Sequence, residues 1–324
     1  MNASTGFGAQ STADDVLQGI DLSGRTAFVT GGASGIGMET ARALAAQGAS
    51  VIIAARDADK AEAAVRDVRE GSGSDKVVAI ACDLASLASV RRCAAEARDR
   101  FERIDLMINN AGVMACPLAH TADGFEMQFG TNHLGHFLLT NLVMPLILAG
   151  EQPRIVNLSS RGHHRDEVHF DDPNFAHRGY EKWAAYGQSK TANIQFAVGL
   201  ERRLASRGVH ALAVHPGVIS TNLGRHMTAD DLAMMRKMIE QNTPPGTQPE
   251  STMKSIAQGA ATTCYAATAP ALEGKGGLYC EDCHVAAVRD DDPKGSVKSY
   301  AVDPDKAERL WTLSETLVGE TFVI

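Results

Sequence analysis

Short, almost continuously apolar runs alternate along the chain with segments whose apolar residues recur at helical spacing. Continuous apolar runs are typical of strands that are covered on both faces of a parallel sheet. Strands that alternate with helices imply right-handed crossovers between parallel neighbours. The pattern therefore predicts an α/β fold with a doubly wound parallel sheet. We predict its strands at residues 25–30, 50–55, 76–84, 104–112, 154–160 and 209–217.

The helical segments begin where capping chemistry favours a start. Asp57 and Ser86 each precede a helical pattern, and their side-chain oxygens can accept hydrogen bonds from its first backbone N–H groups. No linker rich in Pro, Gly or Ser divides the chain. We therefore predict an N-terminal extension at 1–24, one domain at 25–280 and a C-terminal appendage at 281–324 that ends in a helix. The helices are predicted at residues 35–48, 57–71, 86–101, 132–148, 186–208, 229–240 and 303–319.

Composition and charge exclude several classes of function. The 324 residues carry a net charge of −8 without a cluster of Lys and Arg, whereas nucleic-acid-binding proteins show basic patches. The most apolar stretch, residues 137–149, is shorter than the roughly 20 apolar residues of a membrane span. The N-terminus lacks the basic and apolar regions of a secretory signal. We expect a cytoplasmic protein with no nucleic acid and no membrane as partner.

A glycine-rich segment, VTGGASGIGMET, joins the first predicted strand to its helix and contains Gly31, Gly32, Gly35 and Gly37. Such a turn lets backbone N–H groups approach the pyrophosphate of a dinucleotide at the start of a helix. The spacing T-G-x-x-x-G-x-G differs from the G-x-G-x-x-G of other dinucleotide-binding folds. The alternative is a tight turn that only packs the helix on the strand. The position after the first strand favours a cofactor site.

The end of the second predicted strand bears on the choice of dinucleotide. An acid usually contacts the ribose there, but the chain has Ala54 and Ala55 followed by Arg56. A guanidinium can pair with a 2′-phosphate, which an acid would repel. The sequence therefore favours NADP over NAD. Asp57 could itself serve the ribose hydroxyls, which keeps NAD open.

Tyr186 and Lys190 are one turn apart on a predicted helix, so their side chains share one face. An unperturbed tyrosine, with a pKa near ~10, is a poor acid or base at neutral pH. A nearby positive charge favours the phenolate and lowers that pKa. The pair is either a tuned proton donor or only a contact between surface neighbours.

Two of the six cysteines, Cys280 and Cys283, form a C-x-x-C-H pattern of the kind that attaches haem. No export signal accompanies them, and the further clustered ligands that a structural metal needs are not obvious nearby. The other four cysteines are isolated in apolar contexts. Packing is therefore favoured over a redox, haem or metal role for all six.

Seven short motifs follow one another in a fixed order. Together they resemble the short-chain dehydrogenase/reductase family over about residues 22–279. The segments SSRGHH and FDDPNF, and TADDVLQGIDLSG near the N-terminus, resemble the branch of retinol dehydrogenases and WW-domain oxidoreductases, in a soluble member of bacterial type. The motifs are TGGASGIG at 30–37, CDL at 82–84, NNAG at 109–112, NHLGHF at 132–137, IVNLSS at 155–160, Tyr186-x-x-x-Lys190 and HPGVIST at 215–221.

The resemblance implies catalytic roles. Tyr186 would protonate the carbonyl oxygen in reduction and accept the proton in oxidation. Lys190, with the positive charge of the oxidised nicotinamide, would lower the tyrosine pKa and hold the nicotinamide ribose. Ser160 would hydrogen-bond the substrate oxygen, while Ser159 would point to the other side of its strand. Asn132 would hold a water that relays protons to Lys190, or would be only a structural amide.

The resemblance also implies a Rossmann-type NAD(P)-binding catalytic domain at 25–280 with a substrate lid at about 218–250. Asp83 would contact the adenine, Thr221 the nicotinamide end or the phosphates, and Asn109 would brace the sheet. Ser34, where many NADP-using relatives carry a basic residue, argues against strict selectivity, so NADP(H) is expected and NAD(H) is possible. No metal is expected. Cofactor contacts are expected from Gly31, Ala33, Ser34, Gly35, Ile36, Gly37, Arg56, Asp83, Leu84, Asn110, Ala111, Gly112, Tyr186, Lys190, Pro216, Gly217, Val218 and Thr221.

The predicted function is that of an NADP(H)-preferring oxidoreductase that interconverts a carbonyl and an alcohol. One alternative is a nucleotide-bound regulatory or scaffold protein without turnover, against which the complete set of Asn132, Ser160, Tyr186 and Lys190 argues. Another is a reductase of carbon–carbon double bonds, which product NMR would distinguish.

Substrate and assembly are less closely defined. Methionines in the lid favour a bulky hydrophobic substrate or, equally, a packed helix face. His163 and His164 could line the pocket, although packing is favoured. Apolar helices at 137–148 and 191–204 could pair across a two-fold axis in a homodimer or homotetramer. The lid methionines are Met227, Met234, Met235 and Met238.

Overall fold

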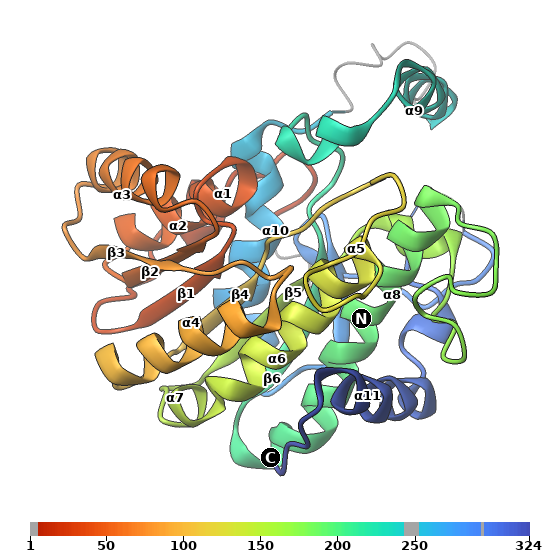
Figure 1. Ribbon diagram of the computed structural model, residues 1–324. Coiled ribbons are helices and arrows are strands. Elements are labelled where there is room, and N and C mark those ends of the chain that lie inside the picture. The colour runs from red at the N-terminus through yellow and green to blue at the C-terminus, as the bar shows by residue number, and fades with distance from the viewer. Residues whose placement is uncertain (1–5, 243–252, 293–294) are drawn as a thin grey trace.

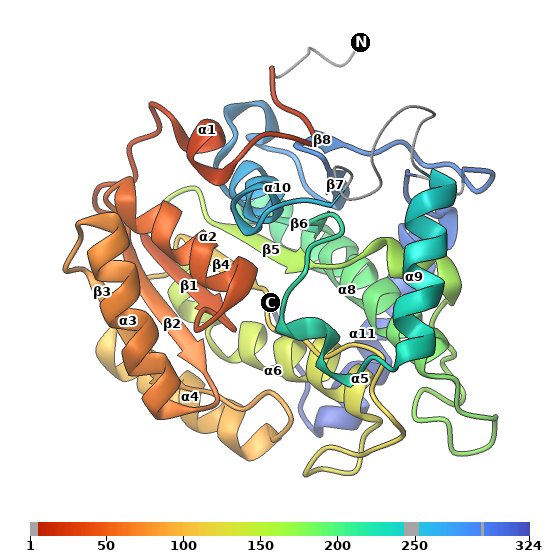
Figure 2. The ribbon, with the colours of Figure 1, turned by 90° about the horizontal axis from the view of Figure 1, so that it is seen from above.

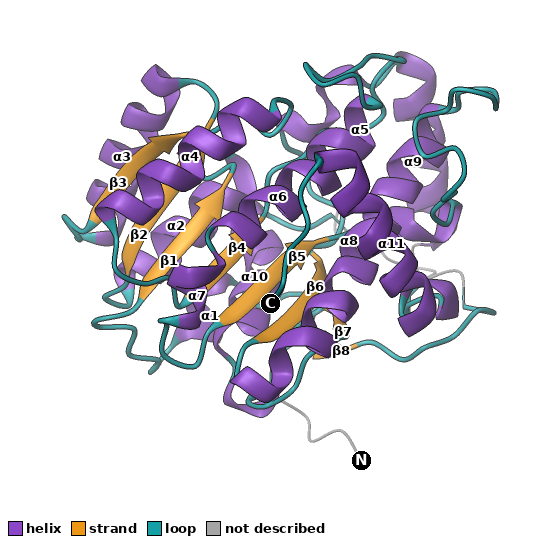
Figure 3. Ribbon diagram, turned by 60° about the horizontal axis from the view of Figure 1, so that its bottom comes forward, coloured by secondary structure: helices purple, strands orange, loops and turns teal. Residues whose placement is uncertain are grey.

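A single sheet runs through the centre of the protein (Figures 1 and 3). The computed structural model describes residues 6–242, 253–292 and 295–324. Within them the strand order is β3-β2-β1-β4-β5-β6-β7-β8, with only the last pair antiparallel. The predicted doubly wound α/β fold is therefore confirmed. The strands are β1 Thr26–Thr30, β2 Ser50–Ala55, β3 Val77–Ala81, β4 Leu106–Asn109, β5 Arg154–Leu158, β6 His210–His215, β7 Leu278–Glu281 and β8 His284–Val285.

Helices cover both faces of this sheet, as expected for strands that are apolar on both sides (Figures 2 and 3). One apolar core lies between the sheet and α1 Ala13–Leu17, α2 Gly35–Ala46, α3 Ala58–Ser72 and α10 Ile256–Thr268. The other lies between the sheet and α4 Leu87–Arg100, α6 Gly135–Leu142, α8 Lys182–Leu204 and α11 Pro304–Val318.

The predicted caps are present. The Asp57 side chain accepts a hydrogen bond from the backbone of Lys60 at the start of α3, and Ser86 does the same for Ser89 in α4. Helix α8 begins four residues before Tyr186, because the Glu181 side chain caps its first turn. Tyr186 therefore lies inside a regular helix whose start is fixed by a neighbouring side chain.

The helix predicted at 132–148 is wrong as a single element. The chain instead forms α5 Met127–Phe129, a π-helical turn Gly130–Leu134, α6, and a separate α7 Met144–Leu148. Proline lacks a backbone N–H and restricts the residue before it, so Pro145 fits the first turn of a new helix rather than the interior of a continuous one. The π-helical turn contains Asn132, and such turns are frequent at functional sites.

Several elements were not foreseen, among them α1, α10, β7 and β8. The sheet continues past residue 280, because β7 and β8 form a hairpin around Asp282 and Cys283, both with positive φ. The C-x-x-C-H pattern is therefore a strand followed by a tight turn. Both cysteines are buried, all six cysteines are thiols, and no group of three or more His, Cys, Asp or Glu in the described residues could hold a metal.

Helix α11 lies against α8 and the π-helical turn (Figure 1). The Trp311 ring packs edge-on against Phe137 and at a tilt against Phe196, with centroids 5.0 and 6.0 Å apart, and His133 Nε2 lies 2.7 Å from Ser314 Oγ. Phe137 and Phe196, which lie on the two helices that were expected to pair across a two-fold axis, are thus covered by a helix of the same chain. The homodimer or homotetramer stays a prediction.

The lid segment is the part of the predicted lid that the structure describes, residues 218–242, together with 253–254 beyond the gap. It contains a 3₁₀ turn, Asn222–His226, and α9 Ala229–Asn242, close to the predicted helix. The rest of the predicted lid, residues 243–250, lies outside the described residues. Among the described helices, none combines the length and apolar character needed to cross a membrane.

Candidate active site

The glycine-rich turn between β1 and α2 lies at the carboxyl edge of the sheet, where its glycines allow close backbone approach. Gly31 has φ +65°, a conformation that favours glycine. A Cβ on Gly37 would meet the Asn110 side chain and lie 2.5 Å from the Gly31 carbonyl oxygen. Asn110 Nδ2 donates to the Thr30 carbonyl oxygen at 2.8 Å, so the loop after β4 holds the turn in shape.

The start of α2 is suited to an anion. Within the described residues, the exposed Ser34 makes no side-chain capping bond to this helix, so its first N–H groups are not taken by a cap. Gly35, with φ +53°, lies against the Thr221 side chain, and the neighbouring Ala33 and Ile36 are partly exposed. This backbone cradle fits the pyrophosphate of a dinucleotide.

The loops after β3 and β4 border the same edge. The Asp83 carboxylate accepts from the Ala85 backbone N–H at 3.0 Å, and Leu84 is buried beneath α6. Asn110 and Ala111 both donate their backbone N–H to Thr30 Oγ1, at 2.9 and 3.0 Å. In β4, Asn109 donates to Asn157 of β5 and to Thr140 of α6, at 2.8 and 2.9 Å. These bonds hold the edge of the sheet in one arrangement.

Arg56 and Asp57 follow β2 at the surface. Arg56 is exposed, and no described residue forms a hydrogen bond with its guanidinium. Asp57 is already engaged: one oxygen caps Lys60 at 3.1 Å, and the other lies 3.4 Å from Lys60 Nζ. Of the two candidates for contact with the ribose, Asp57 is therefore already engaged by Lys60, whereas the Arg56 guanidinium extends into solvent.

Ser160 and Tyr186 meet at the end of β5. Both border Gly162: Ser160 Oγ accepts from the Gly162 backbone N–H at 3.0 Å, and a Cβ on Gly162 would lie 3.3 Å from Ser160 Oγ. Gly162 packs so closely on the Tyr186 ring that a Cβ there would lie 2.7 Å from it. Ser159 points the other way and donates to the Lys190 carbonyl oxygen at 2.8 Å, as expected from the strand pleat.

Lys190 is buried beside Tyr186. Its Nζ lies 5.6 Å from the centre of the Tyr186 ring and donates to the Leu158 carbonyl oxygen at 3.0 Å. A Cβ on Gly112 would lie 3.5 Å from the same Nζ, so the loop after β4 also borders the site. The two predicted partners are thus close together inside the protein rather than on its surface.

The electrostatics differ from the expectation for Tyr186. Burial raises its pKa to about 12, and the hydrogen bond with Ser160 opposes this rise. Burial also lowers the pKa of Lys190 to about 8, because a buried ammonium loses its hydration. In the protein alone, desolvation therefore outweighs the charge of Lys190 on Tyr186.

The Asn132 side chain bonds to the loop after β4 and to α8. Its Oδ1 accepts from the Val113 N–H at 2.8 Å, and its Nδ2 donates to the Val113 carbonyl and to Ser189 Oγ, each at 2.9 Å. Both amide hydrogens are used, and neither goes to Lys190. The side chain thus ties the loop after β4 to α8, and the water relay to Lys190 stays a prediction.

The loop after β6 joins the site to the lid segment. Pro216 and Val218 are half-buried, and Gly217 has φ +103° with Lys254 so close that a Cβ would lie 2.6 Å from its Cδ. The Val218 carbonyl accepts from the Lys254 N–H at 2.9 Å. Thr221 caps the following 3₁₀ turn and touches Gly35, which places it beside the phosphate cradle.

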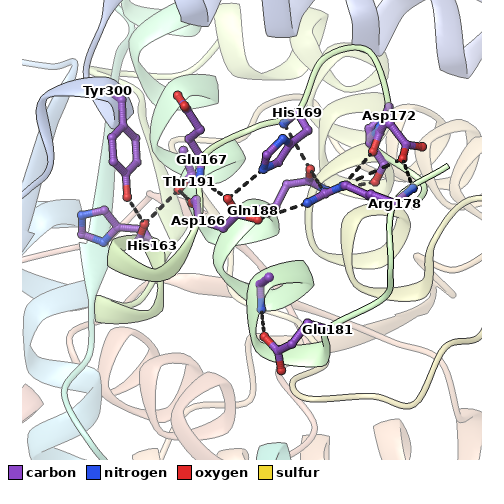
Figure 4. Close-up of polar contacts among 12 residues, drawn as sticks. His163, Asp166, Glu167, His169, Asp172, Arg178, Glu181, Gln188, Thr191 and Tyr300 are labelled. Carbon is purple, nitrogen blue, oxygen red and sulfur yellow. Dashed lines mark hydrogen bonds and ion pairs between the residues drawn. The ribbon is translucent and has the colours of Figure 1, made fainter. Parts of the chain in front are cut away.

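Hydrogen bonds and ion pairs of polar side chains hold the segment between β5 and α8 in place (Figure 4). Gln188 of α8 accepts from Arg178 Nη2 at 2.8 Å and from the His169 N–H at 3.2 Å, and Arg178 also lies 3.3 Å from Asp166. His163 is buried, with Nδ1 on the Ser160 carbonyl at 2.7 Å and Nε2 accepting from a backbone N–H of the C-terminal region. His163 is thus a structural residue rather than a proton carrier.

Sequence reasoning missed the apolar wall around Tyr186. Trp183, one turn earlier on α8, packs with Tyr186 and Ala115, and Met114, Met227 and Met235 lie against them. The spacing of Trp183 and Tyr186 was the only available signal. Of the other lid methionines, Met234 is exposed, and the Met238 side chain lies outside the description.

Comparisons with known proteins identify the family of the chain. Residues 25–232 match the family described as short chain dehydrogenase. The chain is 42% identical over 298 residues to retinol dehydrogenase 13 of Homo sapiens, covering 92% of this chain and 86% of that protein. A crystal structure of an uncharacterized Mycobacterium paratuberculosis protein matches with a TM-score of 0.73 and 36% identity, covering 97% and 100% of the two chains. The RhlG/NADP active-site complex of Pseudomonas aeruginosa matches with a TM-score of 0.60 and 26% identity, covering 81% and 95%.

Fold and site together define an NAD(P)-dependent oxidoreductase. The chain belongs to the short-chain dehydrogenase family, and within it resembles the retinol dehydrogenases, as the seven motifs predicted.

Proposed function

We propose that the protein interconverts a carbonyl compound and an alcohol, with NADP(H) as the preferred cofactor and Tyr186 as general acid and base. The observation that carries this proposal is the contact of the buried Tyr186 with Ser160 on one side and Lys190 on the other. When bound in the cradle of Gly31, Gly35 and Gly37, the dinucleotide supplies or accepts the hydride.

The residues of the chain divide the remaining work. Ser160 donates a hydrogen bond to the substrate oxygen and orients it toward the Tyr186 hydroxyl. Tyr186 gives its proton to that oxygen in reduction and takes it back in oxidation. Lys190 stabilises the phenolate that this proton transfer leaves on Tyr186. Asn132 holds the loop after β4 against α8.

The preference for NADP rests on Arg56. Its guanidinium is exposed beyond β2, while the neighbouring Asp57 serves as a helix cap and contacts Lys60. An available guanidinium suits a 2′-phosphate. The similarity to a protein solved with NADP supports the same choice. We also propose that the protein is located in the cytoplasm.

Tyr186→Phe tests the proposed catalytic role. The ring remains but the proton is lost, so turnover of a carbonyl panel should fall by at least about 100-fold, while NADPH affinity stays within a factor of about two. NADPH oxidation followed by absorbance and NADPH titration by fluorescence measure the two quantities. Turnover at the wild-type rate would refute the mechanism, and product NMR would separate carbonyl reduction from reduction of a carbon–carbon double bond. Among the described residues of the site, the contacts of Ser160, Tyr186 and Lys190 support carbonyl–alcohol chemistry rather than a scaffold role.

Arg56→Ala tests the cofactor preference. Loss of a charge-assisted phosphate contact should weaken NADPH about 10- to 100-fold and leave NADH nearly unchanged. Dissociation constants for the two nucleotides, measured by fluorescence titration, provide the comparison. Equal losses for both would remove the phosphate role, and Lys60→Ala serves as a nearby exposed control.

A further inference from the structure

Asp231 is a buried carboxylate on a helix whose neighbouring residues are exposed. Its side chain is 7% exposed, whereas Asp230 and Leu232 face solvent. As the third residue of α9 it accepts from the Thr228 N–H and hydroxyl at 2.7 and 2.8 Å, and its own N–H lies 3.3 Å from Thr228 Oγ1. A capping acid of this kind normally stays at the surface, so its burial calls for a further role.

The further contacts of Asp231 go to the start of α8. Asp231 Oδ1 accepts from Trp183 Nε1 at 3.0 Å, and Oδ2 forms a close ion pair with Lys182 Nζ. Asp231, Lys182 and Trp183 are called the latch below. The Asp231 carboxylate thus joins α9 to two residues that lie 48 and 49 positions earlier in the chain. The latch places α9 beside the beginning of the catalytic helix (Figure 2).

Trp183 connects the latch to the catalytic residue. Its ring is edge-on to Tyr186, with centroids 6.4 Å apart and planes at 86°. The Arg165 guanidinium lies 5.1 Å from the Trp183 ring, and Met227 and Met235 of the lid segment pack on the same cluster. The indole therefore has one fixed orientation, with its polar end on the lid and its apolar surface beside Tyr186.

The base of the lid segment is held separately. Ile219 pairs with Lys254 as an isolated bridge, and Lys254 Nζ lies 2.5 Å from Asp282 in the turn between β7 and β8. This anchor fixes the two ends of the lid to the sheet but contacts neither Trp183 nor α9 among the described residues. The position of α9 over the site consequently depends on the latch.

We propose that Asp231 is a positioning residue that fixes Trp183 as the wall of a binding site for the bulky apolar group of a carbonyl substrate. The inference rests on the proposed carbonyl–alcohol function. Without the carboxylate, Trp183 Nε1 and Lys182 lose their shared partner and α9 can leave the cluster. A substrate with a long apolar chain depends on the wall, while a small aldehyde needs only Ser160 and Tyr186.

A kinetic comparison tests the wall. Asp231→Asn and Asp231→Ala are assayed with decanal and propanal as substrates, beside the matched exposed control Asp230→Asn. The value of kcat/KM for decanal should fall about 10- to 100-fold, mainly through KM, as expected for loss of buried hydrogen bonds to a charged group. The value for propanal and the affinity for NADPH should change by less than about threefold. An equal loss for both aldehydes would overturn the proposal.

Fluorescence tests the latch without requiring turnover. The chain has two tryptophans, so Trp311→Phe leaves Trp183 as the only indole. In that background Asp231→Asn should raise acrylamide quenching of Trp183 at least about twofold, because its ring becomes accessible, while Asp230→Asn should not. Unchanged quenching would overturn the latch, and the wild-type background repeats the comparison if the Trp311 variant is unstable. If wild type reduces neither aldehyde, the proposed function fails, and quenching still decides whether Asp231 holds Trp183.

Discussion

We expect the buried charge of Lys190 to lower the free energy of unfolding of the protein. Its ammonium is buried with one hydrogen bond, to the Leu158 carbonyl oxygen. Methionine has nearly the same shape and no charge, so Lys190→Met keeps the packing and removes the desolvated cation. The Leu158 carbonyl keeps a partner, because Asn193 Nδ2 also donates to it at 2.9 Å.

The size of the effect follows from the pKa of Lys190. Burial lowers this pKa from its ordinary 10.5 to about 8. At about 1.4 kcal/mol per pKa unit, the charged folded state is disfavoured by about 3 kcal/mol at pH 7. Between the two pKa values the unfolded chain holds the proton more tightly, so the stability of the wild type rises as the pH increases through this window.

Urea unfolding of wild type and Lys190→Met at pH 7 and 9.5, without cofactor, measures the effect. The variant should be more stable by about 3 kcal/mol at pH 7 and by only about 1 kcal/mol at pH 9.5, although it is inactive. An exposed control, Lys76→Met, should change the free energy of unfolding by less than about 0.5 kcal/mol at both values. A difference between wild type and variant that does not change with pH would refute the reasoning.

Two more changes probe the cradle and the C-terminal helix. Gly37→Ala places a Cβ against Asn110 and should reduce NADPH affinity at least about tenfold in a fluorescence titration, whereas Gly179→Ala, in open space, should not; equal affinities would contradict the close approach. Trp311→Ala removes the ring between α6 and α8 and should cost about 3–5 kcal/mol in urea unfolding, against less than about 0.5 for the exposed Thr312→Ala. Equal costs for Trp311 and Thr312 would mean that the ring does not anchor α11.

Much of the fold could be predicted because its signals are local. The six predicted strands are apolar runs with glycine-rich or polar ends, and Asp57 and Ser86 cap their helices through neighbours three residues away. The meeting of Ser160 with Tyr186 was accessible only through the resemblance, since 26 positions separate them. Strand β7 lacks such a local signal and takes its form from the strands it pairs with. Helix α10 does carry one, the capping box of Ser255 and Gln258, which was missed.

What the sequence could not predict depends on burial and on distant contacts. The pKa of Tyr186 rises because the site is desolvated, and no spacing rule reports desolvation. Asp231 resembles an ordinary capping acid until the fold brings Trp183 and Lys182 to it. The docking of α11 on α6 and α8 could not be predicted, because the apolar residues of these helices are visible in the sequence but the element that packs on them is not.

The position of α11 has a consequence for the order in which the protein is made. Helix α8 carries Tyr186 and Lys190, yet part of its apolar surface is covered by residues 304–318, which leave the ribosome long after it. Until then Phe137 and Phe196, which pack on each other, lack the Trp311 ring that covers them. A ribosome that stalls or terminates before Trp311 therefore releases a chain that contains every proposed catalytic residue together with an incompletely covered apolar surface, which chaperones and proteases recognise.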